Sequence, residues 1–453
     1  MSRETRRMVR HYFGTDGIRG RVNRQPMTAE STLRLAIATA RTFAPDGEGT
    51  VIIGRDTRRS GEMIEAALVA GLTSMGLTPQ LAGIVPTPAV AMTTRTSQAR
   101  FGLMVSASHN KYEDNGIKLF SPDGLKFDDP TEEALEAAMA TAFDGTYAAP
   151  GSIATPQRVT GVGDDYIRSC LATVSAGSRI RGMKIVLDCA HGAGFQVAPE
   201  ALLECGADLT VIGAAPDGIN INAGFGSTDT SALKAAVLER GADIGLALDG
   251  DADRVIVVDE TGTEIDGDQV MALIARELHA KGRLKGGGVV STVMSNMGLD
   301  QYLQTLGLSL ARTRVGDRYV GEHMRAHGFN FGGEPSGHII LSDVSTTGDG
   351  LLAGLHVLSV LAERGQPMST LGHVFDPAPQ KLVNIRYTGD NPMDSDRVRA
   401  SIAEAEALMG ARGRMVVRKS GTEPLIRVMA EALEFRLMEQ ALQIVIDAVN
   451  AEI

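Results

Sequence analysis

Tryptophan is absent from this 453-residue sequence, and aromatic residues make up only 4% of it. Proteins that bind single-stranded nucleic acid usually stack the bases on aromatic side chains. Basic residues are also outnumbered, because 44 lysines and arginines stand against 55 aspartates and glutamates, for a formal net charge of −11. Sequence-independent binding to nucleic acid or to a membrane surface depends on a basic face. The composition therefore predicts a protein that binds neither.

Cysteine is scarce and long apolar runs are lacking. The three cysteines (Cys170, Cys189 and Cys205) are an odd number and form no CxxC pair, so a disulfide framework is not expected and a reducing compartment is favoured. The best apolar run, 351–362, is shorter than the roughly 18–20 residues of a membrane span and contains His356. The first ten residues lead into no apolar segment of the kind a secretory signal has. We therefore expect a cytoplasmic protein.

Glycine, in contrast, is abundant, with 52 residues, and many glycines lie in loops between apolar runs. A short apolar run at 51–53 predicts a buried strand, and the apolar spacing over 63–75 predicts a helix after the intervening loop. Further runs of the same kind predict strands at 101–106, 184–188, 243–248, 289–291 and 329–332. Strands that alternate with helices are typical of βαβ units. The sequence therefore predicts the α/β class.

The chain is divided by two stretches that contain proline and small residues, at 147–157 and 376–379, and by a turn at 261–262. The last segment differs from the others, since it pairs strands near 382–387, Met415 and Ile426 with two helices, which is an α+β pattern. We expect three similar mixed-sheet α/β domains and a smaller C-terminal α+β domain. Their expected bounds are 1–155, 156–260, 261–376 and 377–453.

The first of four polar loops at strand ends is SASHN at 106–110, with NGIK at 115–118 close behind. Ligands of open α/β sheets bind beyond the carboxyl ends of the strands, so these loops are the places to look. Ser108 beside His109 is a pairing that a hydroxyl nucleophile can use. A polar turn that ends a strand is an equally good interpretation of this loop alone. A GxSxG elbow is lacking, which disfavours a hydrolase.

The second loop, DGDADR at 249–254, places three carboxylates at alternate positions, where extended backbone turns them to one side. Asp249, Asp251 and Asp253 would repel one another without a cation, and oxygen ligands suit a hard ion such as Mg²⁺. A solvated acidic turn is the weaker interpretation, because apolar strand sequence lies on both sides. An EF-hand is excluded, since Arg254 occupies the position that requires glycine.

The third and fourth loops point to a sugar and to a phosphate. In GEPSGH at 333–338, Glu334, Ser336 and His338 alternate, and carboxylate and hydroxyl groups suit a polyol, although a metal pair or a plain surface loop also fits. In RKSGTEP at 418–424, small residues expose backbone N–H groups, and arginines suit phosphate oxygens in forked contacts. The residues with these properties are Arg418, Ser420, Gly421, Thr422 and Arg427. A basic surface turn is the alternative.

Together, the four loops describe a phosphosugar site with a serine nucleophile and a metal, which is typical of phosphoryl transfer. In this order they resemble the α-D-phosphohexomutases, and the resemblance covers nearly the whole chain. It is carried by YFGTDGIRGRVN from Tyr12, SASHNKYEDNGIKLF from Ser106, LDGDADR from Leu248, GGEPSGH from Gly332 and RKSGTEPLIRVMAE from Arg418. The resemblance implies four domains around a central cleft.

The resemblance also implies roles for single residues. Ser108 would carry the phosphoryl group, and a phosphate oxygen on it would complete the Mg²⁺ ligands Asp249, Asp251 and Asp253. Glu334 and Ser336 would contact the sugar, and the fourth loop would bind the distal phosphate. The basic residues implied around the reacting phosphate, unranked as proton donors or acceptors, are Arg19, His109, Lys118, Arg254 and His338. Two residues depart from the family pattern. Lys111 occupies a position where the family usually has proline, and it adds a charge near Ser108. Pro335 occupies a position where the family often has glutamine.

Within the superfamily, the similarity is strongest to the branch that acts on glucosamine phosphates. It implies isomerisation of glucosamine 6-phosphate to glucosamine 1-phosphate through a sugar 1,6-bisphosphate, which feeds UDP-N-acetylglucosamine and cell-wall precursors. A monomer and a homodimer are both compatible with the sequence. The alternatives are a phosphomannomutase or phosphoglucomutase, which has the same loops, and a non-catalytic phosphosugar-binding regulator. An aspartyl-phosphate phosphatase is disfavoured, because its nucleophilic Asp follows an N-terminal strand.

Overall fold

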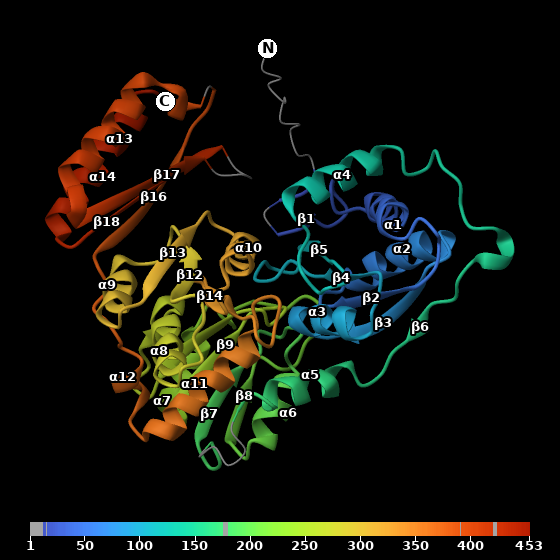
Figure 1. The fold of residues 1–453 in the computed structure, drawn as a ribbon, viewed down its shortest axis with the longest axis horizontal. Coiled ribbons are helices and arrows are strands. Elements are labelled where there is room, and N and C mark those ends of the chain that lie inside the picture. The colour runs from blue at the N-terminus through green and yellow to red at the C-terminus, as the bar shows by residue number, and fades with distance from the viewer. Residues whose placement is uncertain (1–11, 15, 175–179, 390, 420–423) are drawn as a thin grey trace.

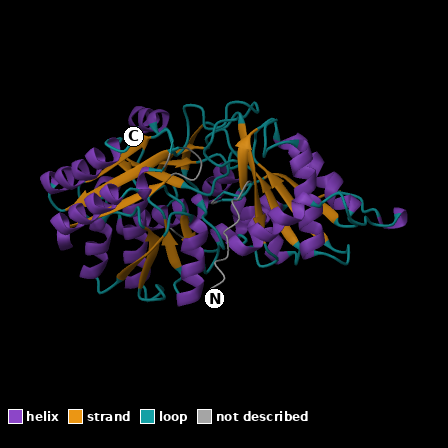
Figure 2. Ribbon diagram, turned by 90° about the horizontal axis from the view of Figure 1, so that it is seen from above, coloured by secondary structure: helices purple, strands orange, loops and turns teal. Residues whose placement is uncertain are grey.

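The computed structural model describes residues 12–14, 16–174, 180–389, 391–419 and 424–453, and four β-sheets follow one another along the chain. We call the chain around each sheet the first unit (12–158), the second unit (162–265), the third unit (267–371) and the fourth unit (380–450). Figure 1 shows the fourth unit beside the third and apart from the first. Viewed from above, helices enclose the strands of the larger units (Figure 2).

The sheet of the first unit has six strands in the order β1-β5-β4-β2-β3-β6. The strands are β1 (Ile18–Arg21), β2 (Thr50–Arg55), β3 (Thr78–Ile84), β4 (Phe101–Val105), β5 (Asp114–Phe120) and β6 (Gln157–Arg158). Its helices are α1 (Ala29–Phe43), α2 (Gly61–Ser74), α3 (Thr87–Thr96) and α4 (Asp129–Ala140). β2 runs parallel to β3 and β4, whereas β5 is antiparallel to both of its neighbours. β6 pairs with β3 although it follows the boundary expected at 155.

Strand periodicity explains how this sheet is covered on both faces. Successive side chains of a strand point to opposite faces. Val51 and Ile53 belong to the apolar core that includes residues of α1, α2 and α4. Ile52 and Met104 belong to a second core, which includes residues of α3 and continues into the second and third units. The first three units therefore share a continuous core, which fixes the loops at their strand ends relative to one another.

The second unit has a five-stranded sheet in the order β11-β10-β9-β7-β8. The strands are β7 (Lys184–Asp188), β8 (Asp208–Ile212), β9 (Ile244–Leu248), β10 (Val255–Asp259) and β11 (Glu264–Ile265). Its helices are α5 (Val162–Leu171), α6 (Val197–Glu204) and α7 (Ser231–Arg240). β7 lies parallel to β8 and β9, and β9 turns back antiparallel into β10. The DGDADR loop is the connection of that antiparallel pair.

The third unit has four strands in the order β13-β12-β14-β15. The strands are β12 (Gly288–Thr292), β13 (Ser309–Thr313), β14 (Phe331–Gly333) and β15 (Ile339–Leu341). Its helices are α8 (Gly267–Ala280), α9 (Met297–Thr305), α10 (Asp317–His327), α11 (Gly350–Arg364) and α12 (Met368–Leu371). The antiparallel pair β14–β15 carries the GEPSGH loop. The first three polar loops therefore all connect antiparallel strands at the edge where the parallel strands end.

The fourth unit is smaller, with an antiparallel sheet in the order β16-β18-β17. It contains β16 (Gln380–Arg386), β17 (Gly413–Lys419), β18 (Leu425–Ala432), α13 (Asp396–Met409) and α14 (Phe435–Asn450). The predicted class of three mixed-sheet α/β units and a smaller α+β unit is confirmed. Across the described residues, the helices lack the length and apolar character that crossing a membrane requires.

Buried hydrogen bonds attach the fourth unit to the third. Arg414 donates to the carbonyls of Val293 and Ser295, each at 2.5 Å, and its Nε lies 2.6 Å from Glu431 Oε2. Asn296 holds the connecting segment, because its side chain both donates to the Ala378 carbonyl and accepts from the Ala378 N–H. The position of the fourth unit thus depends on Arg414 of β17, on Glu431 of β18 and on the turn before α9.

The buried carboxyl group of Asp268 supports this turn by accepting a hydrogen bond from the Asn296 N–H at 2.8 Å. Burial raises the pKa of Asp268 from 3.8 to about 7. A carboxyl whose pKa is higher in the folded state contributes stability at low pH and loses it as pH rises through the folded pKa. Between pH 4 and 7 this group should lower the free energy of unfolding by about 1.4 kcal/mol per pH unit.

We expect Asp268→Asn to remove this part of the pH dependence, because an amide does not titrate. Urea denaturation of both proteins at pH 5, 6, 7 and 8 measures it, and the stability of the variant relative to wild type should rise up to about pH 7. Asp396→Asn, at an exposed position of α13, is the control and should follow the wild-type curve. Parallel curves for Asp268→Asn and wild type would contradict the assigned pKa.

Candidate functional site

Ser108 and the DGDADR loop meet at the junction of the first and second units. Ser108 Oγ lies 2.5 Å from Asp249 Oδ2, and both residues are fully buried. The backbones approach closely, since a Cβ at Gly250 would lie 2.5 Å from the Ser108 carbonyl oxygen. Ser108 itself has a φ of +51°, the left-handed region that costs energy for residues other than glycine. The loop is thus held in a specific strained conformation that directs Oγ at the carboxylates.

Arg58 holds the Ser108 loop in this conformation, and the sequence did not identify it. Its guanidinium donates to four carbonyl oxygens of the loop, those of Ser108, Asn110, Lys111 and Asp114, at 2.5–3.0 Å. Its Nε lies 2.8 Å from the carboxylate of Asp56, and both side chains are fully buried. The Lys111 side chain, expected to add charge here, is exposed.

The three aspartates of the second loop form one buried group. One carboxylate oxygen from each of Asp249, Asp251 and Asp253 lies within 4.8 Å of the other two. Lys118 Nζ, on β5, lies 2.7 Å from both Asp251 and Asp253. Burial and the charges of Asp253 and Asp251 raise the pKa of Asp249 well above its ordinary value. Lys118 therefore compensates only part of the negative charge.

This group fits a divalent cation. Within the described part of the chain, the buried Oδ1 atoms of Asp251 and Asp253 accept no hydrogen bond, and Asp253 Oδ1 has only the longer contacts with His338 and Arg254, at 3.5 and 3.8 Å. A buried carboxylate oxygen without a partner is costly, and oxygen ligands in this number are what a hard cation accepts. Asp249, Asp251 and Asp253 could therefore hold such an ion beside Ser108 Oγ.

Basic side chains lie on the other side of Ser108. His109 Nδ1 is 3.5 Å from Ser108 Oγ. Burial, with the positive charges of Arg254 and Arg19, lowers the pKa of His109 to about 4. Among the described residues, the buried Nε atoms of Arg19 and Arg254 make no hydrogen bond, although Arg254 Nε lies 3.8 Å from Asp253 Oδ1. Guanidinium N–H groups that are free to donate, beside a neutral imidazole, are suited to an anionic group such as a phosphoryl group on Ser108.

The third loop brings Glu334 and His338 toward the same region. His338 Nδ1 lies 3.5 Å from Asp253 Oδ1, and its Nε2 lies 3.1 Å from Asp317 Oδ2. Burial acts in the opposite direction, but Asp317 and Asp253 raise the pKa of His338 to about 10. Glu334 is buried and accepts a hydrogen bond from the Gly316 N–H at 3.1 Å. Ser336 is exposed, whereas Glu334 and His338 of the same loop are buried.

The fourth loop lies in the fourth unit. Arg418 of β17 and Arg427 of β18 are directly opposite each other in the sheet. Burial and the charge of Arg427 lower the pKa of Arg418, and none of the described residues makes a hydrogen bond to the buried Arg427 Nε. Two like charges at one cross-strand pair repel, so an anion bound between them would stabilise the pair. Ser420, Gly421 and Thr422 lie outside the described residues.

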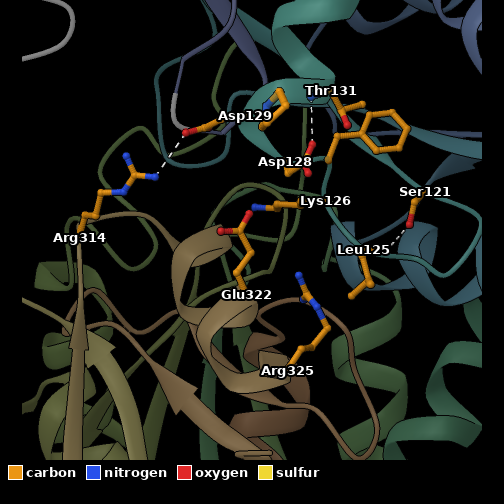
Figure 3. A pocket seen from close by; sticks show the side chains of 11 residues that line it. Ser121, Leu125, Lys126, Asp128, Asp129, Thr131, Arg314, Glu322 and Arg325 are labelled. Atoms are coloured by element: carbon orange, nitrogen blue, oxygen red, sulfur yellow. Dashed lines mark hydrogen bonds and ion pairs between the residues drawn. The ribbon is translucent and has the colours of Figure 1, made fainter. Parts of the chain in front are cut away.

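Three further charged residues of this region were not identified from the sequence. Lys126, which follows β5, lies 2.5 Å from both Asp16 and Asp317. It also lines a cavity of about 540 Å³ between 121–131 and α10 (Figure 3). Asp16 lies in the GTDGIRG loop, in which the sequence indicated only Arg19 as a site residue. Lys126 and Asp317 lie in segments without a recognisable pattern.

We expect Arg58→Met to lower the free energy of unfolding by about 3–5 kcal/mol, because it leaves the Asp56 carboxylate buried and unpaired. Urea denaturation measures this change. The neighbouring Arg59 is exposed, and Arg59→Met is the matched control, expected to cost less than about 1 kcal/mol. Equal losses from the two variants would contradict the role given to Arg58.

Curated relatives cover the chain from end to end. It is 71% identical over 444 residues to the phosphoglucosamine mutase of Hyphomonas neptunium, a match that covers 98% of this chain and 99% of the relative. It is 52% identical over 444 residues to the phosphoglucosamine mutase of Caulobacter vibrioides, with the same two coverages.

Solved structures show the same fold at low identity. A phosphoglucomutase/phosphomannomutase family protein from Burkholderia thailandensis superposes with a TM-score of 0.82 at 21% identity, over 96% of this chain and 97% of that one. The N-acetylphosphoglucosamine mutase of Aspergillus fumigatus, in complex with GlcNAc-6P and magnesium, gives 0.63 at 19% identity, over 96% of each chain.

The family models of phosphoglucomutase/phosphomannomutase match all four units. The alpha/beta/alpha domains I, II and III match residues 10–145, 164–262 and 266–377, and the C-terminal domain matches 382–447. The chain therefore belongs to the phosphoglucomutase/phosphomannomutase family.

Proposed function

We propose that this chain is a phosphoglucosamine mutase, an isomerase that interconverts glucosamine 6-phosphate and glucosamine 1-phosphate. The observation that carries the proposal is the 2.5 Å contact of Ser108 Oγ with Asp249, inside a buried group of three carboxylates. The choice of glucosamine rests on the relative of that name, which is 71% identical over nearly the whole chain.

In the proposed reaction, phosphorylated Ser108 transfers its phosphoryl group to a hydroxyl of the sugar phosphate and forms a 1,6-bisphosphate. The P–O bond to Ser108 breaks as the bond to the sugar oxygen forms, and the sugar hydroxyl loses its proton. The intermediate then turns around, and the P–O bond between its other phosphoryl group and the sugar breaks as Ser108 Oγ takes that group, while the sugar oxygen regains a proton. Mg²⁺, held by Asp249, Asp251 and Asp253 with a phosphoryl oxygen on Ser108, would neutralise charge on the transferred group.

The basic residues divide between two tasks in this scheme. His109 is the candidate to accept the proton of the sugar hydroxyl, because a pKa of about 4 leaves its imidazole neutral near pH 7. Lys118 and His338 have pKa values raised by neighbouring aspartates, so they stay cationic and stabilise negative charge. Arg19 and Arg254 serve the same purpose, since the described residues leave their Nε atoms without a hydrogen bond. These assignments leave the proton transfer with His109, the basic residue whose ring lies 3.5 Å from Ser108 Oγ.

The far end of the substrate is assigned to the third and fourth loops. Glu334 and Ser336 would bind the sugar hydroxyls. The other phosphate would be bound by Arg418, Ser420, Gly421, Thr422 and Arg427. The repulsion between Arg418 and Arg427 supports this assignment, because the distal phosphate would relieve it. Turning the bisphosphate exchanges which phosphate faces Ser108, so these loops must bind both orientations.

We also propose the divisions 1–155, 156–260, 261–376 and 377–453, which the four family matches support. A cytoplasmic location is proposed, and it is supported by three free cysteines, Cys170, Cys189 and Cys205. There the product would supply UDP-N-acetylglucosamine and cell-wall precursor synthesis.

We expect Ser108→Ala to abolish isomerisation while leaving the thermal midpoint of unfolding unchanged, because it removes only the hydroxyl that carries the phosphoryl group. Turnover of glucosamine, glucose and mannose phosphates is measured side by side, with intact-protein mass spectrometry of the phosphoserine. Ser97→Ala, at the exposed end of α3, is the control and should retain full activity. Turnover by Ser108→Ala would contradict the covalent scheme, and a preference for mannose or glucose phosphates would favour the alternative mutases.

We expect Asp251→Asn to weaken Mg²⁺ binding by at least tenfold, because it removes one of three anionic ligands. Isothermal titration of Mg²⁺ into wild type and variant measures this directly, without reference to turnover. Asp343→Asn, which breaks a surface pair with Lys285, is the control and should bind like wild type. Identical titrations for Asp251→Asn and wild type would refute the ligand assignment.

A further inference from the structure

Lys126 is a charged link between the first and third units. Its ammonium lies 2.5 Å from Asp16 Oδ1 in the first unit and 2.5 Å from Asp317 Oδ2, at the start of α10 in the third unit. The side chains of all three residues are mostly removed from solvent, with exposures of 10%, 17% and 10% for Lys126, Asp16 and Asp317. An ammonium shared by two carboxylates at this depth fixes both of them more strongly than a surface ion pair would.

Asp317 and Asp16, the two partners of Lys126, are each linked by further contacts to Asp253 in the group of three aspartates. Asp317 lies 3.1 Å from His338, and His338 lies 3.5 Å from Asp253 of the second unit. Lys118 lies 2.7 Å from Asp253 and 3.3 Å from Asp16, which returns to the starting residue. Acidic and basic side chains therefore alternate around a closed ring. The members of this charge ring are Asp16, Lys126, Asp317, His338, Asp253 and Lys118.

We propose that Lys126, through Asp317, is a positioning residue for phosphoryl transfer. It sets the third unit, with Glu334 and His338, against the metal-binding loop of the second unit and the Ser108 loop of the first. This inference rests on the proposed function and deepens it. Without the ammonium, Asp16 and Asp317 are like charges close together in a buried place, and their repulsion displaces the first and third units slightly at the seam where they meet.

Other contacts keep the seam in place when Lys126 is changed, so its role can be separated from folding. Arg318 of α10 donates to the Phe127 carbonyl at 2.8 Å and lies 2.7 Å from Glu132 of α4. Thr346 donates to the Gly124 carbonyl at 2.5 Å. The cavity beside Lys126, lined by Arg314, Glu322 and Arg325 as well, gives the seam room to adjust (Figure 3). Loss of Lys126 should therefore shift the loops by a fraction of an ångström to an ångström without unfolding the chain.

The test compares Lys126→Met, Lys126→Arg and Asp317→Asn with wild type in the full chain, using purified phosphorylated protein. We expect Lys126→Met and Asp317→Asn each to lower kcat about tenfold to a hundredfold, the effect of a small misplacement of reacting groups. KM should change less than threefold, and Lys126→Arg, which keeps the charge, should recover most of kcat. The double variant should lose no more than the worse single variant, because both break one link. Lys285→Met, which breaks an exposed pair with Asp343, is the control and should leave kcat unchanged.

The outcomes separate this inference from the function it rests on. If wild type carries phosphoserine but isomerises no hexosamine or hexose phosphate, the proposed function fails. If wild type turns over and Lys126→Met matches Lys285→Met, the positioning role is overturned. If Lys126→Met does not fold, Asp317→Asn tests the positioning role instead, because the amide keeps the volume of the carboxylate. A wild-type kcat in Asp317→Asn would then overturn the proposal. A loss in the double variant equal to the product of the single losses would also overturn it.

Discussion

The structure of the site depends on the mutual repulsion of three buried carboxylates. Asp249, Asp251 and Asp253 each place an oxygen within 4.8 Å of the other two, away from solvent. Like charges so close in a medium of low dielectric constant would separate unless cations hold them. Lys118 supplies one positive charge from the first unit, and His338 supplies another from the third. The need to balance these carboxylates therefore ties together loops from three units, in addition to the apolar core that those units share.

The backbone around the carboxylates is arranged to permit this concentration of charge. In each of the first three sheets, a parallel strand is followed by an antiparallel neighbour, and the polar loop connects the two. These loops therefore lie at the edge of each sheet where the parallel strands end. Glycine at position 250 lets the metal-binding loop touch the Ser108 carbonyl, where any side chain would clash. Arg58 then fixes the other side of that contact by gathering the carbonyls of the Ser108 loop. The placement of Ser108 thus depends on the buried side chain of Arg58 and on the close backbone approach that Gly250 permits.

The fourth unit stands in a different relation to the site. Its Arg414–Glu431 pair and the Asn296 side chain attach it to one turn of the third unit, whereas Arg418 and Arg427 repel each other at the far end of the same sheet. Under the proposed function, a phosphate that binds between Arg418 and Arg427 relieves the repulsion of this cross-strand pair. A phosphate bound by Arg418 and Arg427 would therefore balance charge in the fourth unit, as Lys118 and His338 balance the carboxylates where the other three units meet.

The sequence by itself determined the α/β class, the four segments and the residues at the loop tips, because strand periodicity and clustered polar residues are local properties. Ser108, the three aspartates, Lys118, His338 and Glu334 are brought together as their loops indicated. Only the tertiary structure decided that Arg58 supports the Ser108 loop, that β6 joins the first sheet and that Lys126 meets Asp317. Asp317 lies 191 positions from Lys126 along the chain, and no local pattern encodes such a contact. It exists because a shared apolar core packs the units together, and buried charges must then find partners wherever the packing has placed them.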